Sequence, residues 1–325
     1  MILAIETSCD DTCAAVVDPA DGAIASNVVS SQGIHDRYGG VVPEVAARHH
    51  LELLDVAIDD ALAGAGIGLD DVSLVAVTQG PGLVGALLIG LAEAKALALA
   101  RGLPLAPVDH LQGHVAANFV APDPFEPPFV CLIASGGHTL LARVDDRDGF
   151  TVLGATLDDA AGEAFDKGAR LLGLPYPGGP ALQALAAEGD PDVYSFPTAE
   201  GVAGLDFSFA GLKTALLYAL RDDPEAPKAD LAASYQRAIV DQLVRRVERA
   251  LEQTGVERLA IGGGVAANGP LRERVRELGV EAHVPPMSLC TDNAAMIGSA
   301  ARFVEALAPG SYDALDAYAT GERGL

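Results

Sequence analysis

Two histidines, His110 and His114, are the residues whose types and spacing point most directly to chemistry. If the run that holds them is helical, their side chains share one face, with Cβ atoms roughly 5–6 Å apart. That separation lets two imidazoles bind one metal ion, because histidine nitrogen is a common ligand of divalent transition metals. The pair therefore predicts a metal site, although histidines at this spacing also occur on surfaces and at helix ends.

The residue after the first histidine bears on the reaction that such a metal would serve. A zinc peptidase of the His-Glu-x-x-His type has a glutamate there, which acts as the general base. This chain has Leu111 at that position, so a peptidase would lack its base. The pattern therefore favours a metal that serves a reaction other than peptide hydrolysis.

Glycine-rich turns are the second group of candidate residues. Gly136 and Gly137 come just after the apolar run 129–134, and Gly262 to Gly264 end the strand that 258–261 predicts. Small residues let backbone N–H groups approach a phosphate closely, and a helix that begins at such a turn adds its dipole. Each turn alone is ordinary, but together they predict a cleft for a phosphate or a nucleotide.

The elements that must position these residues occur twice along the chain. Residues 2–18 and 129–145 each predict two apolar strands joined by a small polar turn. In both halves helical stretches follow, and then a strand with a glycine-rich end (74–78 and 258–261) leads into another helix. This matched order predicts an internal duplication of two α/β domains with a cleft between them.

Length and composition agree with two domains. The chain has 325 residues, of which 50% are hydrophobic, so two cores of ordinary size can form. We expect the first domain to comprise 1–128 plus 294–325, and the second 129–293.

The net charge of −24 argues against broad, non-specific nucleic-acid binding, because phosphate affinity comes mainly from clustered lysine and arginine.

The apolar segments and the cysteines indicate a cytoplasmic protein that makes no use of a membrane. The longest apolar stretch, 83–100, is interrupted by Glu93 and Lys95, and therefore predicts a buried helix. No segment has the pattern of a signal peptide. The four cysteines are too few and too scattered for a disulfide framework, so we expect reduced thiols.

Ten motifs resemble, in the same order, those of the bacterial TsaD family of tRNA threonylcarbamoyladenosine transferases. They are "IETSCDDT" from Ile5, "YGGVVPEVAARHH" from Tyr38, "TQGPGLVGALLIG" from Thr78, "HLQGH" from His110, "SGGHT" from Ser135, "DDAAGEAFDK" from Asp158, "YPGGP" from Tyr176, "DFSFAGLKTA" from Asp206, "GGGVAAN" from Gly262 and "TDNAAMIG" from Thr291. The resemblance implies duplicated RNase H-like domains of the actin, heat-shock ATPase and sugar kinase superfamily. It also implies transfer of a threonylcarbamoyl group from threonylcarbamoyl-AMP to N6 of adenosine 37, in tRNAs that read ANN codons, with release of AMP.

The resemblance also implies a metal set of His110, His114 and Asp292. Three protein ligands leave positions open for a substrate, as a catalytic metal requires. One carboxylate and two imidazoles suit Fe(II) or Zn(II); we expect one Fe(II) per subunit, with Zn(II) as the alternative. From the residues alone, Asp292 could instead cap the helix that the following apolar run predicts.

The same resemblance implies residues that bind the acyl adenylate. They are Ile133, Ala134, Ser135, Gly136 and Gly137 at the phosphate or carbamoyl end, Asp166 at the ribose, and Gly179 and Asn268 at the nucleotide. Each has an ordinary alternative: Asp166 could be a solvated helix residue, Gly179 a turn residue, and Asn268 a helix cap. The residues alone do not choose between these roles.

Asp10 and Asp11 lie in the first strand-to-strand turn. The family usually has Asp-Glu here, so Asp11 is one methylene shorter than its counterpart. We therefore predict that Asp10 is the catalytic carboxylate and accepts a proton during transfer. Glu44, Arg48 and His50 lie in a matching segment, which we expect to form a surface for a partner or for RNA.

Partners follow from the same resemblance and from the acidity of the chain. Bacterial relatives work with a TsaB-like inactive paralogue and a TsaE-like ATPase. Since the net charge opposes tRNA docking, we expect either a confined arginine-rich surface or RNA binding shared with these partners.

A small-molecule kinase, a metallopeptidase and a non-catalytic scaffold are the alternative functions. The kinase would not need the metal set, the peptidase would need a base, and the scaffold should lack the histidines.

Overall fold

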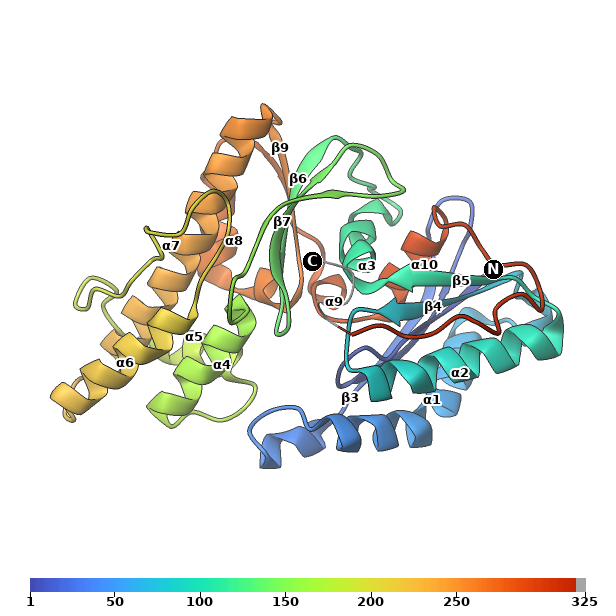
Figure 1. Cartoon of the computed structure of the whole chain (residues 1–325), viewed down its shortest axis with the longest axis horizontal. Helices are drawn as coiled ribbons and strands as arrows, with labels where there is room; N and C mark the ends of the chain where they lie inside the picture. Colours follow the sequence, from blue (N-terminus) through green and yellow to red (C-terminus); the bar gives the residue numbers. More distant parts are fainter. Residues whose placement is uncertain (320–325) are drawn as a thin grey trace. The chain divides into compact units, whose positions relative to one another are not determined.

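A computed structural model describes residues 1–319 as two α/β units (Figure 1). Unit 1 comprises 1–127, 146–149 and the described residues from 285 on, and unit 2 comprises 128–145 and 150–284. The expected division assigned 146–149 and 285–293 to the second domain, whereas these residues pack with unit 1. Asp292 consequently belongs to the same unit as the two histidines.

Unit 1 contains a five-stranded sheet in the order β3-β2-β1-β4-β5, in which β1 pairs antiparallel with β2 and parallel with β4. Its strands are β1 (Ile2–Glu6), β2 (Asp11–Val17), β3 (Ile24–Ser31), β4 (Leu74–Gly80) and β5 (Leu105–Asp109). Its helices are α1 (Pro43–Ala65), α2 (Val84–Arg101), α3 (His110–Ala116), α9 (Met287–Cys290) and α10 (Ala294–Ala301).

Unit 2 repeats this plan with a sheet in the order β10-β9-β6-β7-β8. Its strands are β6 (Phe129–Ala134), β7 (Thr139–Val144), β8 (Thr151–Ala155), β9 (Arg258–Gly262) and β10 (Glu281–His283). Its helices are α4 (Ala161–Leu172), α5 (Gly178–Ala186), α6 (Ala210–Asp222), α7 (Lys228–Thr254) and α8 (Gly269–Arg276). β6 pairs antiparallel with β7 and parallel with β9, as β1 does with β2 and β4. The predicted duplication is therefore confirmed.

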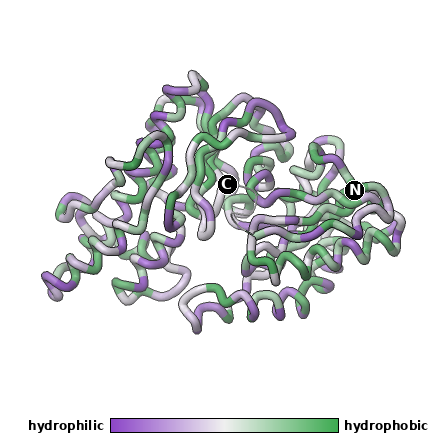
Figure 2. The backbone as a smooth tube through the Cα atoms, in the orientation of Figure 1, coloured by the Kyte–Doolittle hydropathy of each residue, from purple (hydrophilic) through white to green (hydrophobic). Residues whose placement is uncertain are grey.

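Burial on both faces of the unit 1 sheet explains the apolar sequence of its central strand β1. All five residues of β1 are buried. Leu3 and Ile5 share a core with residues of α1 and α2, whereas Ala4 lies against Gly298 of α10. A strand covered on both faces reads as a continuous apolar run, and Figure 2 shows hydrophobic residues concentrated along the strands.

In unit 2 the long helix α7 packs on β6 and β7. Its buried Tyr235 donates a hydrogen bond to the carbonyl of Ala164 at 2.9 Å, which ties α7 to α4. Gly168 of α4 lies directly against the Tyr235 ring, because a Cβ there would collide with it. These contacts hold α4 against α7.

The apolar stretch 83–100 forms α2, which is buried on only one face. Leu87 and Leu91 are in the core, whereas Leu88 and Leu99 are exposed. Among residues 1–319, no helix is both long enough and apolar enough to cross a membrane.

Candidate metal and nucleotide site

Helix α3 begins at His110 because Asp109, the last residue of β5, caps it. The Asp109 carboxylate accepts hydrogen bonds from the backbone N–H groups of Leu111 at 2.8 Å and Gln112 at 3.2 Å. An aspartate at this position pairs donors that the first helical turn leaves without partners. The second carboxylate oxygen accepts from the hydroxyl of Tyr318. The cap therefore fixes where the helical face with both histidines starts.

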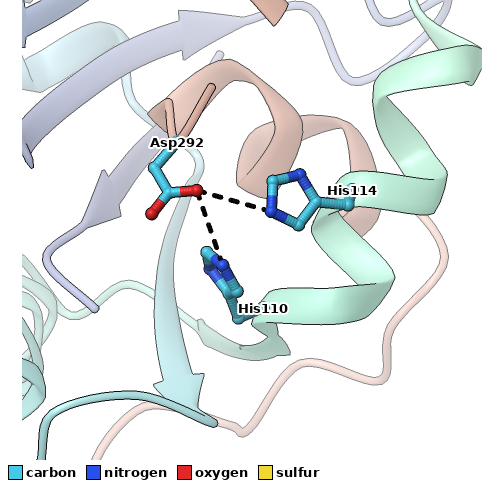
Figure 3. Close-up of side chains that lie close together, drawn as sticks. All are labelled: His110, His114 and Asp292. Atoms are coloured by element: carbon cyan, nitrogen blue, oxygen red, sulfur yellow. Dashed lines mark ion pairs between the residues drawn. The ribbon is translucent and has the colours of Figure 1, made fainter. Parts of the chain in front are cut away.

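His110, His114 and Asp292 converge on one point (Figure 3). Oδ1 of Asp292 lies 3.6 Å from Nε2 of His110 and 3.4 Å from Nε2 of His114. Atoms that each lie about 2.0–2.2 Å from one ion are roughly 3–4 Å apart, so this spacing suits a shared metal. The three residues thus form a set that can hold a metal.

Asp292 is available to this set because its neighbour caps the next helix. The Asn293 side chain accepts from the backbone N–H of Met296 at 3.0 Å and caps α10. The alternative in which Asp292 caps this helix is therefore wrong. The cap at Asn293 instead leaves Asp292 one residue before the cap, with its carboxylate near the histidines of α3.

The environment of His114 also fits a metal. The His114 side chain is fully buried, and among residues 1–319 neither of its ring nitrogens has a hydrogen-bond partner. Leaving a buried polar atom without a partner costs about 1–3 kcal/mol. A metal bound at Nε2 would remove part of that cost, so the orphaned imidazole fits a ligand role.

Charge around His110 makes the site attractive to cations. Burial alone would lower the pKa of His110, but the carboxylates of Asp292 and Glu6 outweigh burial and raise this pKa to about 9. Burial tends to raise the pKa of Glu6, whereas the neighbouring His110 lowers it on balance. The same negative potential that favours imidazolium would favour a divalent cation.

Asp10 and Asp11 lie at the turn between β1 and β2, in the same unit as the metal set. Gln32, the residue after β3, donates its backbone N–H to the Asp10 carbonyl at 3.1 Å and so ties the turn to the end of that strand. Burial, followed by repulsion from Asp292 and Asp10, raises the pKa of Asp11 to about 6. The catalytic role that the sequence assigned to Asp10 stays a prediction.

In unit 2 the segment from Ile133 to Gly137 ends β6 and forms a tight turn. Ile133 and Ala134 are buried in the sheet. Ser135 donates its N–H to the carbonyl of His138 at 2.8 Å, and its hydroxyl accepts from the N–H of His138 at 3.1 Å. A Cβ at Gly136 or Gly137 would meet no protein atom within 4 Å, so open space lies beside this backbone.

Two further residues predicted to bind the nucleotide lie on neighbouring helices, Asp166 on α4 and Gly179 on α5. Its Oδ1 accepts the N–H of Gly178 at 2.8 Å, so the carboxylate lies at the start of α5. The adjacent Lys167 pairs with other acids, Asp159 at 2.7 Å and Glu163 at 2.9 Å. A Cβ at Gly179 would lie 4.0 Å from the Cβ of Phe165, so there is room beside this backbone.

The Asn268 side chain is engaged within the protein. Its Oδ1 accepts from the N–H of Leu271 at 3.0 Å and caps α8. Its Nδ2 donates to the side-chain oxygens of Gln183 and Gln236, each at 2.9 Å. The capping alternative thus describes this side chain, and its contact with a nucleotide stays a prediction.

Comparison with known proteins identifies the family. The model of the family "TsaD: tRNA N6-adenosine threonylcarbamoyltransferase" matches residues 23–299. The transferase of that name from Clostridium botulinum is 50% identical over 313 residues, which cover 93% of this chain and 92% of the relative. The transferase from Symbiobacterium thermophilum is 51% identical over 311 residues, covering 94% and 91%. The chain belongs to the TsaD family.

Family membership settles the activity at a coarse level. The chain is a tRNA-modifying transferase that acts on N6 of adenosine.

Solved structures show the same fold. One of them is component A of the (R)-2-hydroxyglutaryl-CoA dehydratase from Acidaminococcus fermentans, with a TM-score of 0.57 and 16% identity. That match covers 93% of this chain and 96% of the other. The predicted actin-like fold class is confirmed.

In this TsaD-family chain His50 is not a surface residue. Its side chain is fully buried, with Nε2 3.0 Å from the carbonyl oxygen of Cys9 and Nδ1 2.8 Å from the hydroxyl of Thr12. The expected surface role is therefore wrong for His50. Glu44 and Arg48 do lie exposed on α1, where they form an ion pair at 2.7 Å.

Sequence reasoning also missed Glu6 of the TsaD-family motif. Glu6 is fully buried beside His110, with Oε2 3.0 Å from Nδ1 of that histidine. The only signal available in the sequence was a charged residue at the end of an apolar strand. Nothing local to Glu6 indicated that it would meet a residue 104 positions away.

Proposed function

We propose that this transferase uses threonylcarbamoyl-AMP as its donor and modifies N6 of adenosine 37 in tRNAs that read ANN codons, releasing AMP. The observation that carries the proposal is the set of two buried histidines, His110 and His114, with the half-buried Asp292 in a member of this family. A small-molecule kinase of the same fold has no use for this set.

One divalent metal per subunit would be held by His110, His114 and Asp292, with Fe(II) expected and Zn(II) as the alternative. When bound, such a metal acts as a Lewis acid that withdraws charge from a carbonyl or phosphoryl oxygen. The protein contributes three fixed ligands and a buried surrounding in which charge interactions are strong. The orphaned nitrogens of His114 support this role.

The adenylate would be bound by the unit 2 loops. The backbone from Ile133 to Gly137 would donate N–H groups to the phosphate or carbamoyl end, and the open space at the two glycines supports this. Asp166 would accept from ribose hydroxyls near the start of α5. Gly179 would allow close approach of the nucleotide, and Asn268 would contact it.

Asp10 would accept the proton that the adenine amine loses as it attacks the carbamoyl carbonyl. An exocyclic amine on adenine is a weak nucleophile, so positioning has to supply much of the rate. The target base lies in an anticodon loop, where unstacked bases can be reached without opening a duplex. The proton acceptor and the metal set lie in the same unit.

We further propose that the chain works in the cytoplasm with a TsaB-like inactive paralogue and a TsaE-like ATPase, and that these share the binding of tRNA. The net charge of −24 supports shared binding, because it opposes docking of a polyanion on this chain alone.

The decisive experiment is incubation with synthesised threonylcarbamoyl-AMP and an ANN-reading tRNA, with and without both partners, followed by nucleoside mass spectrometry. We expect modified adenosine with the wild-type chain and none with His114→Ala. A tRNA with guanosine at position 37 is the matched substrate control. Absence of modified adenosine in every combination would overturn the proposal.

A further inference from the structure

Glu6 is a buried carboxylate directly beside the metal set. It ends β1, and its side chain is inaccessible to solvent. Its Oε2 lies 3.0 Å from Nδ1 of His110 and accepts the hydroxyl of Thr78 at 2.5 Å. Its Oε1 accepts the backbone N–H of Ser8. Both oxygens are therefore held in place by contacts from three separate segments.

The contact with His110 fixes which imidazole nitrogen carries the proton. An ionised carboxylate can only accept hydrogen bonds, so Nδ1 of His110 must be the donor. In the neutral ring the lone pair then lies on Nε2. That nitrogen faces Oδ1 of Asp292 at 3.6 Å, on the side of the ring where the metal set converges. The Glu6 contact thus places the lone pair of the ring on Nε2, the nitrogen that belongs to the metal set.

We propose that Glu6 is a positioning residue that fixes the tautomer and orientation of His110 and thereby raises the affinity of the site for its metal. The inference rests on the proposed metal set. A carboxylate behind a ligating histidine also makes that ligand more basic, and losing such a partner typically weakens metal binding about 10–100-fold.

The two histidines differ in this respect. Among residues 1–319, His114 has no hydrogen-bond partner on either ring nitrogen, whereas His110 has the Glu6 carboxylate. Burying the Glu6 carboxylate also costs free energy unless the charge is paired and hydrogen-bonded. An apolar residue would suit the all-buried strand β1 better. These observations favour a role for Glu6 in preparing His110 over a role in packing.

The experiment measures Co(II) affinity of the metal-stripped full chain by visible absorption against a competing chelator. Glu6→Gln preserves shape and removes charge, and we expect about 10-fold weaker binding; Glu6→Ala should lie toward about 100-fold. The matched control is Thr12→Val, which removes an equally buried polar contact in the same unit, to His50. The control should keep wild-type affinity even if its thermal stability falls.

His110→Ala separates the inference from the proposed metal set. If His110→Ala binds Co(II) as tightly as wild type, the proposed metal set fails. If His110→Ala loses affinity but Glu6→Gln keeps it, the metal set stands and the inference on Glu6 is overturned. Glu6→Gln made in the His110→Ala background should add no further loss. An equal loss in both backgrounds would assign Glu6 a general structural role and contradict the proposal.

Discussion

Two polar residues buried near the β1–β2 turn, Glu6 and His50, have different roles. Glu6 pairs with His110 of the metal set, whereas His50 pairs with the backbone of Cys9 and the hydroxyl of Thr12. His50 therefore holds the turn that carries Asp10 and Asp11. Since Nε2 of His50 faces a carbonyl oxygen and Nδ1 faces a hydroxyl, a neutral ring satisfies both contacts.

His50 should make stability depend on pH. Burial holds its pKa below the ordinary value of 6.5. Below pH 6.5 the unfolded chain takes up a proton that the folded chain does not, so the stability that neutral His50 contributes declines as the pH falls. We expect the advantage of wild type over His50→Gln in free energy of unfolding to shrink from pH 7.5 to pH 5. Urea denaturation at several pH values measures it, and a constant difference would contradict the prediction.

Asp10 is predicted to act in transfer and not in binding. We expect Asp10→Ala to bind metal and AMP like wild type while transfer falls about 10²–10⁴-fold, the usual contribution of a general base. Transfer is measured by nucleoside mass spectrometry under single-turnover conditions. Asp11→Asn is the comparison, because the Asp11 carboxyl has a pKa of about 6. If Asp10→Ala transfers normally and Asp11→Asn does not, the base is Asp11.

At the scale of elements, caps and turns determine where the functional residues lie. Asp109 starts α3 at His110, Asn293 starts α10 just after Asp292, and Asn268 starts α8. In each case a side-chain oxygen accepts a backbone N–H of the first helical turn, which fixes the residue at which the helix begins. The positions of the metal ligands therefore depend on two caps far apart in sequence.

Removing the cap of α3 should cost stability and loosen the metal set. We expect Asp109→Ala to lower the free energy of unfolding by about 1 kcal/mol, because backbone donors of Leu111 and Gln112 lose their acceptor. Asp109→Asn keeps an oxygen in place and should retain most of that stability. Urea denaturation measures both variants. Equal stability losses in the two variants would show that charge, and not capping, is what matters.

At the scale of the whole molecule, acidity and duplication are the main features. The two sheets share one strand order, so each unit presents its loops after equivalent strands. Three arginines on α7 and α8 are paired with carboxylates: Arg237 with Asp192, Arg245 with Glu200 and Arg274 with Asp241. Cationic side chains that are already paired contribute little to attracting RNA.

This charge balance predicts that tRNA binding requires partners. We expect the lone chain to bind an ANN-reading tRNA weakly at about 150 mM salt, with affinity that improves steeply as salt is lowered. Addition of the TsaB-like and TsaE-like proteins should give tight binding at the same salt. Fluorescence anisotropy of labelled tRNA measures both. Tight binding by the chain alone at physiological salt would refute shared binding.

The sequence by itself determined the duplicated α/β plan, the histidine pair and the family, because strand alternation, helical spacing and motif order are local properties of the chain. Only the tertiary structure decided that Asn293 is the cap beside Asp292, that His50 is buried, and that Glu6 lies against His110. The contacts of His50 and Glu6 join segments that lie far apart in the sequence, 104 residues for Glu6 and His110, and no local pattern encodes such a contact. The cap of α10 is a local contact, but Asp292 and Asn293 are both favoured capping residues, and the structure decided between them. The metal ligands could thus be named from motifs. Glu6, which we propose orients His110, could be named only from the fold, because the fold places the end of β1 beside the start of α3.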